Sequence, residues 1–245
     1  MVKSKPFAVF DIDGTLIRWQ MLHVIYDWLG RAGLIAENDF AAIRAARLDW
    51  KKRKAIDSFR AYEDVLYAIV ARSIAGITPK VFERAAQEAF NEYRDQTYRY
   101  TRDLIRDLKQ KGYFVIAISG SPDEVVKHLA EYYGFDDYAA TIQMRQGGRY
   151  TGEIMVAAMH KPELLRELMA KHGLDFAGSI GVGDSEGDIS MLEMVEHPIA
   201  FNPAKGLFLH AEKQHWKVVV ERKNMIYEFE PKDGRYRLAR TNAEE

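Results

Sequence analysis

Four aspartates that follow apolar, strand-like segments are the residues of this sequence best suited to chemistry. Asp11 and Asp13 come directly after the apolar run 7–10, and Asp184 and Asp188 follow a second apolar segment. Crowded carboxylates repel one another, so a cation is needed if all four are ionised. Oxygen donors without cysteine or clustered histidine suit Mg²⁺ better than zinc or copper. One such aspartate alone is equally well explained as a turn or cap, but the four together favour metal-assisted chemistry.

A hydroxyl-containing turn and a lysine form a second group of candidates. Ser119, Gly120 and Ser121 precede a predicted helix, whose free N–H groups would attract an anion. We expect Ser121 to cap that helix in a capping box with Glu124, which leaves Ser119 to contact a phosphate oxygen. Lys161 stands just before the first residue of another predicted helix, where its charge opposes the helix dipole. Taken alone, a lysine in this position is more often a solvated surface residue.

Alternating strand and helix patterns carry these polar groups. Strands are expected at 7–10, 113–118, 141–144, 150–154, 179–182, 198–201, 216–220 and 225–229, and helices at 104–111, 121–133, 162–171 and 188–195. The alternation predicts an α/β fold with a Rossmann-like parallel sheet and helices on both faces. Ligands of such sheets bind outside the carboxyl ends of the strands. We therefore expect the polar clusters to converge on one edge of the sheet.

The segment that follows the first aspartate pair has a different pattern. Its apolar residues recur at helical spacing, and Thr78-Pro79 is a helix start with an N-cap followed by proline. It predicts about four helices that stand apart from the sheet. We therefore expect a core formed by residues 1–17 and 100–245, with an inserted all-helical cap domain at residues 18–99.

Composition narrows the classes of function. The 245 residues are 47% hydrophobic, and 35 basic residues nearly balance 36 acidic ones, which gives no reason to expect nucleic-acid or anionic-membrane partners. The chain has no cysteine, so disulfides and thiolate catalysis are excluded. The N-terminal apolar stretch is too short for a signal peptide, and no window approaches the roughly 18 apolar residues of a membrane span. We expect a cytoplasmic protein, and its oligomeric state is left open.

The order of the polar clusters resembles the motifs of the haloacid dehalogenase superfamily of phosphohydrolases. The first motif of that family, Asp-x-Asp-Gly-Thr, is similar to residues 11–15, and its second motif, a strand ending in Ser or Thr, is similar to Ser119. Lys161 resembles the lysine of the third motif, and Asp184 with Asp188 resembles the acidic fourth motif. The helical block after the first motif is similar to the cap of the phosphoserine-phosphatase-like branch, subfamily IB.

The resemblance implies a Mg²⁺-dependent phosphatase that acts on a small phosphomonoester metabolite through an aspartyl-phosphate. It implies Asp11 as nucleophile and Asp13 as general acid and base. The implied Mg²⁺ ligands are the Asp11 carboxylate, the Asp13 backbone carbonyl and Asp184, with Asp188 binding either directly or through water. The implied phosphate-binding groups are Ser119, Gly120 and Lys161. Family members that cleave carbon–halogen bonds lack the second aspartate, so the resemblance disfavours dehalogenation.

One departure from the resemblance concerns the substrate. Phosphoserine phosphatases usually carry a glutamate where this chain has Gln20, which disfavours phosphoserine and leaves another small phosphomonoester as the expected substrate. Trp19, Gln20 and His23 are the cap residues that could overhang the site. A phosphoryl transferase of the same superfamily and a non-catalytic phosphate-binding module are the alternatives. Dinucleotide binding is rejected because Glu186 stands where the fingerprint needs glycine.

Overall fold

The computed structural model describes residues 5–52 and 58–243 of the chain. Within them the strands form one nine-stranded sheet with the order β4-β3-β2-β1-β5-β6-β7-β8-β9. The strands are β1 (Phe7–Phe10), β2 (Phe114–Pro122), β3 (Asp137–Gln146), β4 (Arg149–Met155), β5 (Ile180–Gly183), β6 (His197–Phe201), β7 (Lys217–Arg222), β8 (Met225–Lys232) and β9 (Arg235–Thr241). The six neighbouring strands β3, β2, β1, β5, β6 and β7 pair in parallel. Strands β4, β8 and β9 extend the two edges of the sheet with antiparallel pairing. The predicted Rossmann-like parallel core is confirmed.

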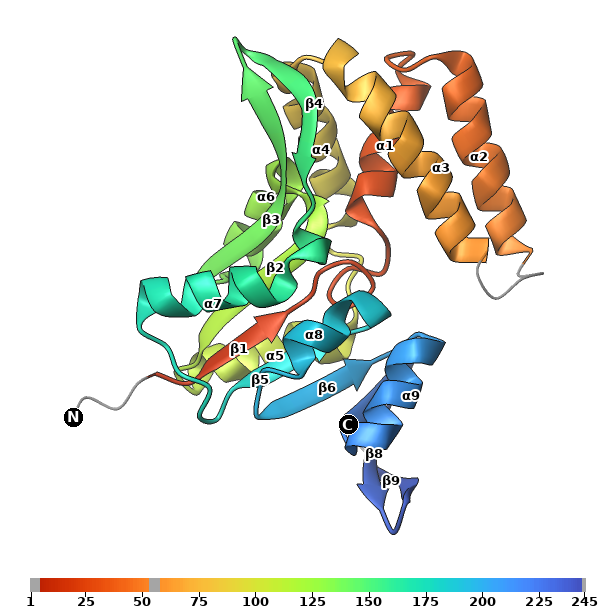
Figure 1. The fold of residues 1–245 in the computed structure, drawn as a ribbon. Helices are drawn as coiled ribbons and strands as arrows, with labels where there is room; N and C mark the ends of the chain where they lie inside the picture. Colours follow the sequence, from red (N-terminus) through yellow and green to blue (C-terminus); the bar gives the residue numbers. More distant parts are fainter. Residues whose placement is uncertain (1–4, 53–57, 244–245) are drawn as a thin grey trace.

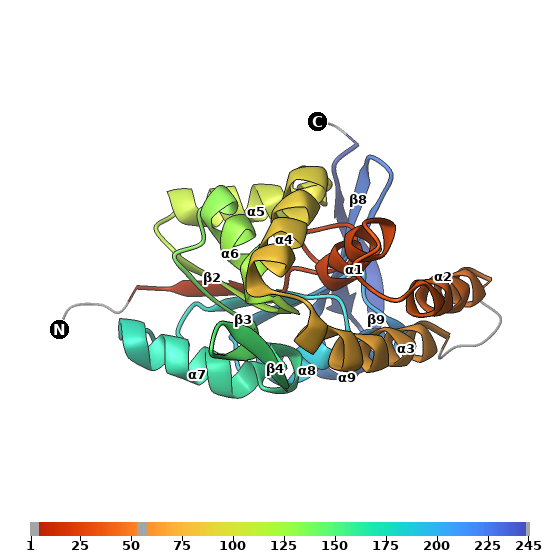
Figure 2. The ribbon, with the colours of Figure 1, turned by 90° about the horizontal axis from the view of Figure 1, so that it is seen from above.

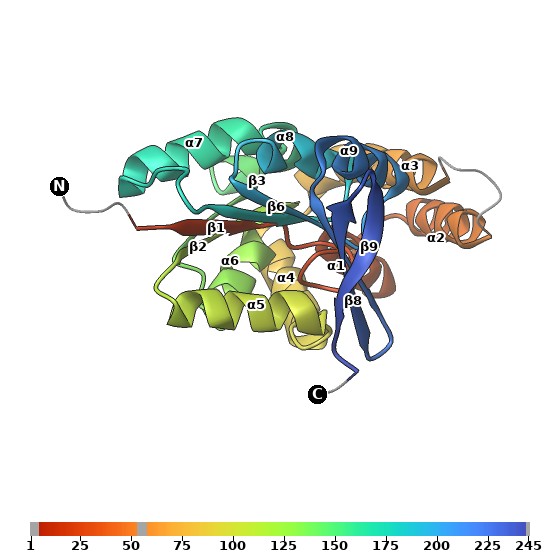
Figure 3. The same cartoon turned by 90° about the horizontal axis from the view of Figure 1, so that it is seen from below.

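Helices cover both faces of this sheet. They are α1 (Met21–Arg31), α2 (Glu37–Lys51), α3 (Ser58–Ser73), α4 (Pro79–Tyr93), α5 (Arg99–Gln110), α6 (Asp123–Tyr133), α7 (Lys161–His172), α8 (Ile189–Leu192) and α9 (Lys205–Gln214), with 3₁₀ turns η1 (Ile74–Gly76), η2 (Ala157–Met159) and η3 (Glu186–Asp188). Figures 2 and 3 show α5 and α6 on one face and α7, α8 and α9 on the other. Because side chains of a strand alternate in direction, β1 sends Ala8 and Phe10 into one core and Phe7 and Val9 into the other. Each face of the central strand is thus anchored by its own apolar layer.

The helices α1 to α4 form the predicted helical cap beyond the sheet (Figure 1). Thr78 caps α4 as expected, because its hydroxyl accepts a hydrogen bond from the Val81 N–H at 3.4 Å. The hairpin of β3 and β4 rises beside these helices, and the rings of Phe82 and Tyr150 pack edge to face at 5.7 Å between their centres. This packing of a core hairpin against the cap was not predicted from the sequence.

The predicted capping box at the start of α6 is wrong. The helix begins at Asp123, Pro122 occupies the N-cap position, and no side chain bonds to it there. Ser121 instead lies within strand β2, one residue before its end. The Glu124 carboxylate is drawn away by the Arg145 guanidinium and the Tyr150 hydroxyl, at 2.6 and 2.8 Å.

Two elements near the C-terminus were also missed. The segment of α9 exposes Phe208 and Leu209, so its apolar residues do not form one clean helical stripe. The segment of β9 places arginines between its few apolar residues, which hides the strand pattern. The part of the chain that the structure describes contains no helix with the length and apolar character needed to cross a bilayer.

Candidate active site

The register of the central strands brings three polar clusters to one edge of the sheet. Phe10 of β1 lies level with Ala117 of β2 and with Val182 of β5. Asp11 therefore follows β1 where β5 also comes to its end, and Ser119 lies two residues further along β2. The Asp11 N–H donates to the Val182 carbonyl at 3.0 Å, which continues the ladder by one step. The predicted convergence at the sheet edge is therefore observed.

Lys161 lies between two of the aspartates. Its ammonium donates to Asp11 Oδ1 at 2.7 Å and to Asp188 Oδ1 at 2.5 Å. The lysine is 3% exposed, which rules out the solvated surface residue that its position alone also allowed. A helix start that would otherwise repel this cation holds it because two buried carboxylates compensate.

Buried carboxylates outnumber the buried cation here. Burial raises the pKa of Asp11 to about 7, with Lys161 opposing the rise and Asp188 adding to it. Burial and the charge of Asp11 also raise the pKa of Asp184 well above its usual value. Burial disfavours the charge of Lys161, but its two carboxylate partners outweigh this effect and raise its pKa. The cluster consequently favours the uptake of further positive charge.

The geometry of three of these carboxylates suits a metal ion. Asp11, Asp184 and Asp188 each offer an oxygen, and these oxygens lie within 4.8 Å of one another. Asp188 Oδ2 accepts from the N–H groups of Asp184 and Ser185, at 3.1 and 2.9 Å, and from the Ser185 hydroxyl. These bonds fix the Asp188 carboxylate before any ion arrives. An all-oxygen set of this kind fits Mg²⁺.

Asp13 is held apart from that group. Its Oδ1 accepts from the Met21 N–H at 2.6 Å, and its Oδ2 accepts from the Ser119 hydroxyl at 2.9 Å. Burial still raises its pKa, although these hydrogen bonds oppose the rise. The Met21 N–H lies at the N-terminus of α1, so the first cap helix is tied directly to Asp13.

The other predicted phosphate-binding groups lie at the same edge. The Ser119 hydroxyl also accepts from the Ser121 N–H at 3.0 Å, so it is held by local bonds on both sides. Gly120 lies within β2 rather than at the start of α6, and a β-carbon there would approach that of Ala158 to 3.1 Å. Gln20 occupies the N-cap position of α1, half-buried, without a side-chain cap bond.

Sequence reasoning missed a part of the cap that faces this site. Burial raises the pKa of Glu63 on α3 to about 7, with smaller contributions from Asp64 and from Asp13. Partial burial, together with the charges of Glu63 and Asp13, raises the pKa of Tyr67 one helical turn later. The spacing of four residues puts Glu63 and Tyr67 on one helix face, but nothing in the sequence alone distinguishes that face.

His23 belongs to the interior of the cap. It is 1% exposed, its ring lies 4.8 Å from that of Tyr62, and its Nδ1 has no hydrogen-bond partner among the described residues. Burial, with a smaller effect of Arg47, lowers its pKa to about 3. Trp19 packs beside it, with ring centres 5.9 Å apart. Both side chains therefore contribute to the packing of the cap.

A His23→Phe variant is expected to lose less stability in acid than the wild type. A pKa lowered by folding gives stability that is complete above the unfolded value of 6.5 and is lost as pH falls towards 3. Urea unfolding should show a wild-type loss between pH 7 and pH 5 that exceeds the loss of the variant by about 2 kcal/mol. The exposed His197 provides the control, because His197→Gln should behave as the wild type. Equal losses in wild type and His23→Phe would contradict this assignment.

Comparisons with known proteins agree with these features. A family model described as haloacid dehalogenase-like hydrolase matches residues 8–193. A phosphoserine phosphatase of Streptomyces coelicolor is 31% identical over 204 residues, which are 82% of this chain and 45% of that protein. A phosphoserine phosphatase of Archaeoglobus fulgidus is 28% identical, over 82% of this chain and 53% of that protein. The chain spans about half the length of these curated relatives.

Solved structures share the fold. A Bordetella pertussis protein of unknown function has a TM-score of 0.72 at 24% identity, covering 88% of this chain and 98% of that one. A phosphoserine phosphatase solved as a phospho-aspartyl intermediate analogue has a TM-score of 0.62 at 22% identity, covering 91% and 96%. With the family model spanning all four acidic positions and Lys161, this chain belongs to the haloacid dehalogenase-like hydrolase family.

Proposed function

We propose that this hydrolase is a Mg²⁺-dependent phosphatase that cleaves a small phosphomonoester through an aspartyl-phosphate on Asp11. The observation that carries the proposal is that two neighbouring carboxylates have different hydrogen-bond partners. Asp11 is paired with the Lys161 ammonium, whereas Asp13 is held by the Met21 N–H and the Ser119 hydroxyl. Two carboxylates in different environments are suited to two different roles in one reaction.

Asp11 is the proposed nucleophile. The contact with Lys161 lowers its pKa against the effect of burial and so favours the ionised form that attacks phosphorus. The attack forms an oxygen–phosphorus bond to one Asp11 carboxylate oxygen and releases the alcohol of the substrate. Lys161 is also proposed to stabilise the charge of the equatorial phosphate oxygens, together with Ser119 and the Gly120 N–H.

Asp13 is the proposed general acid and base. Its pKa is raised by burial, which favours the protonated form that can donate a proton to the departing alkoxide. The resulting carboxylate then takes a proton from the water that attacks the aspartyl-phosphate. The hydrogen bond from Met21 couples this residue to the first cap helix. That contact supports a cap that orients the acid as well as enclosing the substrate.

Mg²⁺ is the proposed cofactor, held by Asp11, Asp184, Asp188 and the Asp13 backbone carbonyl. When bound, it would neutralise the repulsion between the Asp11 carboxylate and the phosphate. The cluster of three carboxylate oxygens within 4.8 Å supports this assignment. The raised pKa of Asp184 supports it further, because a cation at this place would relieve the crowding of negative charge.

We propose a small phosphorylated metabolite other than phosphoserine as the substrate, because Gln20 supplies no charge for an ammonium group. The proposed cap domain comprises residues 18–99. Its two ends lie side by side, because the Arg18 N–H donates to the Gln96 carbonyl at 2.9 Å, and this supports the proposed bounds. Residues 1–4, 53–57 and 244–245 of the proposed domains lie outside the described residues. The cytoplasmic location and the absence of nucleic-acid and membrane partners stay predictions.

An Asp13→Asn variant tests the intermediate directly. With p-nitrophenyl phosphate, whose leaving group departs without an acid, we expect rapid phosphorylation followed by a stalled enzyme, because no base activates water. The steady-state kcat should fall by about 10²–10⁴-fold, and intact-mass measurement after quenching should find one added phosphoryl group that hydroxylamine removes. The exposed Asp233→Asn variant is the control and should turn over normally.

Other results of that experiment point elsewhere. A phosphoprotein that passes its phosphoryl group to added glycerol faster than to water would favour the phosphoryl-transferase alternative. Mg²⁺ binding without turnover of any phosphomonoester would favour the non-catalytic module. An Asp13→Asn enzyme with wild-type kcat would contradict the role of Asp13.

Gly14→Ala is expected to impair the proposed metal site from the loop that follows Asp13. Gly14 has a φ of +85°, and a β-carbon there would lie 2.1 Å from Asp184 Oδ2, so Asp184 must move. Gly112 is a matched control, because its φ is +84° and nothing lies within 4 Å of its β-carbon position. Both alanine variants should lose about 1–2 kcal/mol of unfolding free energy. Only Gly14→Ala should need at least about tenfold more Mg²⁺ for half-maximal turnover; an unchanged requirement would contradict the role of Asp184.

A further inference from the structure

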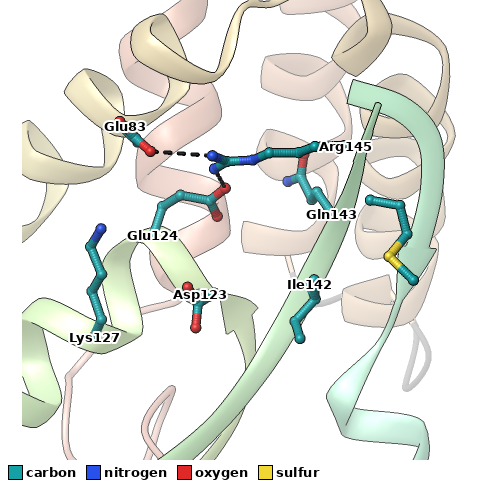
Figure 4. A pocket seen from close by; sticks show the side chains of 8 residues that line it. Glu83, Asp123, Glu124, Lys127, Ile142, Gln143 and Arg145 are labelled. Atoms are coloured by element: carbon teal, nitrogen blue, oxygen red, sulfur yellow. Dashed lines mark hydrogen bonds and ion pairs between the residues drawn. The ribbon is translucent and has the colours of Figure 1, made fainter. Parts of the chain in front are cut away.

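A cavity lies outside the proposed active site, where the cap meets the hairpin of β3 and β4. It measures about 370 Å³ and is lined by residues of α4, α6 and β3. In Figure 4, Glu124 from α6 and Gln143 from β3 point toward one another across this space, with Arg145 above and Asp123 below. A volume of this size is in the range that small organic ligands occupy.

Glu124 is the central feature of the cavity. It is only 4% exposed, and its Oε1 accepts from the Arg145 guanidinium at 2.6 Å and from the Tyr150 hydroxyl at 2.8 Å. Its Oε2 is buried without a hydrogen-bond partner among the described residues. A buried carboxylate oxygen without a donor is costly. The described residues therefore supply no hydrogen-bond donor to Glu124 Oε2.

A second acceptor faces the same space. Gln143 is 5% exposed, and its Oε1 is likewise buried without a partner in the described part of the chain. Both side chains are held by regular structure, Glu124 in the first turn of α6 and Gln143 within β3. Two preorganised acceptors that converge from different elements match one ligand group with several N–H donors.

The net charge of the lining side chains indicates whether a ligand should be a cation or an anion. Glu83, Asp123 and Glu124 contribute three carboxylates against the cations Lys127 and Arg145, which leaves one negative charge. Arg145 is already committed to Glu83 and Glu124, at 3.4 and 2.6 Å. The cavity is therefore suited to a cationic ligand that donates hydrogen bonds.

The same lining distinguishes an organic cation from a metal ion. Within the described ranges, the one group of three acidic side chains close enough to hold a metal is the cluster of Asp11, Asp184 and Asp188. Ile142 and Met144, which also line the cavity, offer no oxygen ligand to a metal ion. A primary ammonium group, which needs only hydrogen-bond acceptors, suits this lining better than a metal ion.

We propose that this cavity binds a small organic molecule through a primary ammonium group, which donates to Glu124 Oε2 and Gln143 Oε1. Because Glu83 belongs to α4 of the cap and Glu124 to α6 of the core, the ligand occupies the junction of the two. The site is separate from the phosphate chemistry, and its occupancy needs no phosphorylated compound.

Calorimetric titration with n-propylammonium chloride at constant ionic strength tests this proposal. We expect saturable binding at one site of the wild-type protein, with tetramethylammonium, which has no N–H donor, binding at least tenfold more weakly. Glu124→Gln keeps an oxygen for Arg145 and Tyr150 but replaces the second oxygen with an N–H₂ group. This change should weaken n-propylammonium binding by about ten- to a hundredfold. Turnover of p-nitrophenyl phosphate by this variant should equal that of the wild type.

Matched variants keep the test decisive. Glu131→Gln, two turns further along α6 at an exposed position, should bind as the wild type does. If Glu124→Gln does not fold, Gln143→Met removes the second acceptor and should also weaken binding. Absence of saturable binding to the wild type, or equal binding of tetramethylammonium, would overturn the proposal. Binding that persists in folded Glu124→Gln but disappears in Asp184→Asn would place the ammonium in the active site and overturn it as well.

Discussion

Replacing Asp11 with asparagine is expected to lower kcat for p-nitrophenyl phosphate by at least about 10⁴-fold, to the background rate. The neutral amide cannot form the acyl-phosphate bond. Among the described carboxylates at the sheet edge, Asp11 and Asp188 both contact the Lys161 ammonium. Asp188 cannot replace Asp11, because the N–H groups of Asp184 and Ser185 hold its carboxylate in place. The variant should also fail to acquire a phosphoryl group, in contrast to Asp13→Asn. Initial rates and intact-mass measurement after quenching test both expectations.

The controls for Asp11→Asn separate chemistry from folding. The variant should keep the wild-type circular dichroism spectrum, because asparagine fills the same volume and its amide oxygen can still accept from Lys161. The exposed Asp233→Asn variant should retain full kcat in the same assay. Substantial turnover by Asp11→Asn prepared in a host without competing phosphatases would mean that another residue attacks phosphorus, and would falsify the proposed intermediate.

The site was predictable because its chemistry depends on strand ends. A short apolar strand followed by Asp11 and Asp13 is a local pattern, and parallel strands place their carboxyl ends together whatever the details of packing. The same logic placed Ser119 and Asp184 near them. Lys161 needed the resemblance to a family, since its sequence position alone gave no sign that two buried carboxylates compensate its charge.

The features that the sequence did not predict depend on contacts between distant segments. Glu124 has the spacing of a capping residue, but Arg145 and Tyr150, which follow it by 21 and 26 residues, bind its carboxylate instead. The bond from Met21 to Asp13 depends on where the first cap helix begins relative to the sheet edge. The approach of Glu63 to Asp13 depends on how α3 packs. Neither periodicity nor capping rules contain such information, because each concerns only neighbours along the chain.

The second large effect is expected for Lys161→Met, which should lower both turnover and stability. Removing a cation that is 3% exposed leaves Asp11 and Asp188 as unpaired buried carboxylates, and loss of one partner from a buried ion pair costs about 3–5 kcal/mol. Lys171→Met in the same helix is the matched control. Its pair with Asp137 is made by a side chain that is 63% exposed, so its loss should cost less than about 1 kcal/mol.

The pH dependence of Lys161→Met tests whether charge or packing causes the loss. Lys161 lowers the pKa of Asp11, so its removal should raise that pKa further above its present value of about 7. A carboxyl group whose pKa is raised by folding destabilises the protein as pH rises from about 4 through the folded pKa. Urea unfolding should therefore give a larger difference from the wild type at pH 8 than at pH 5. A double variant, Lys161→Met with Asp188→Asn, should be less destabilised than the two single changes add up to, because it removes one of the unpaired charges. A loss that is the same at both pH values and strictly additive would instead assign the role of Lys161 to packing of its methylene groups.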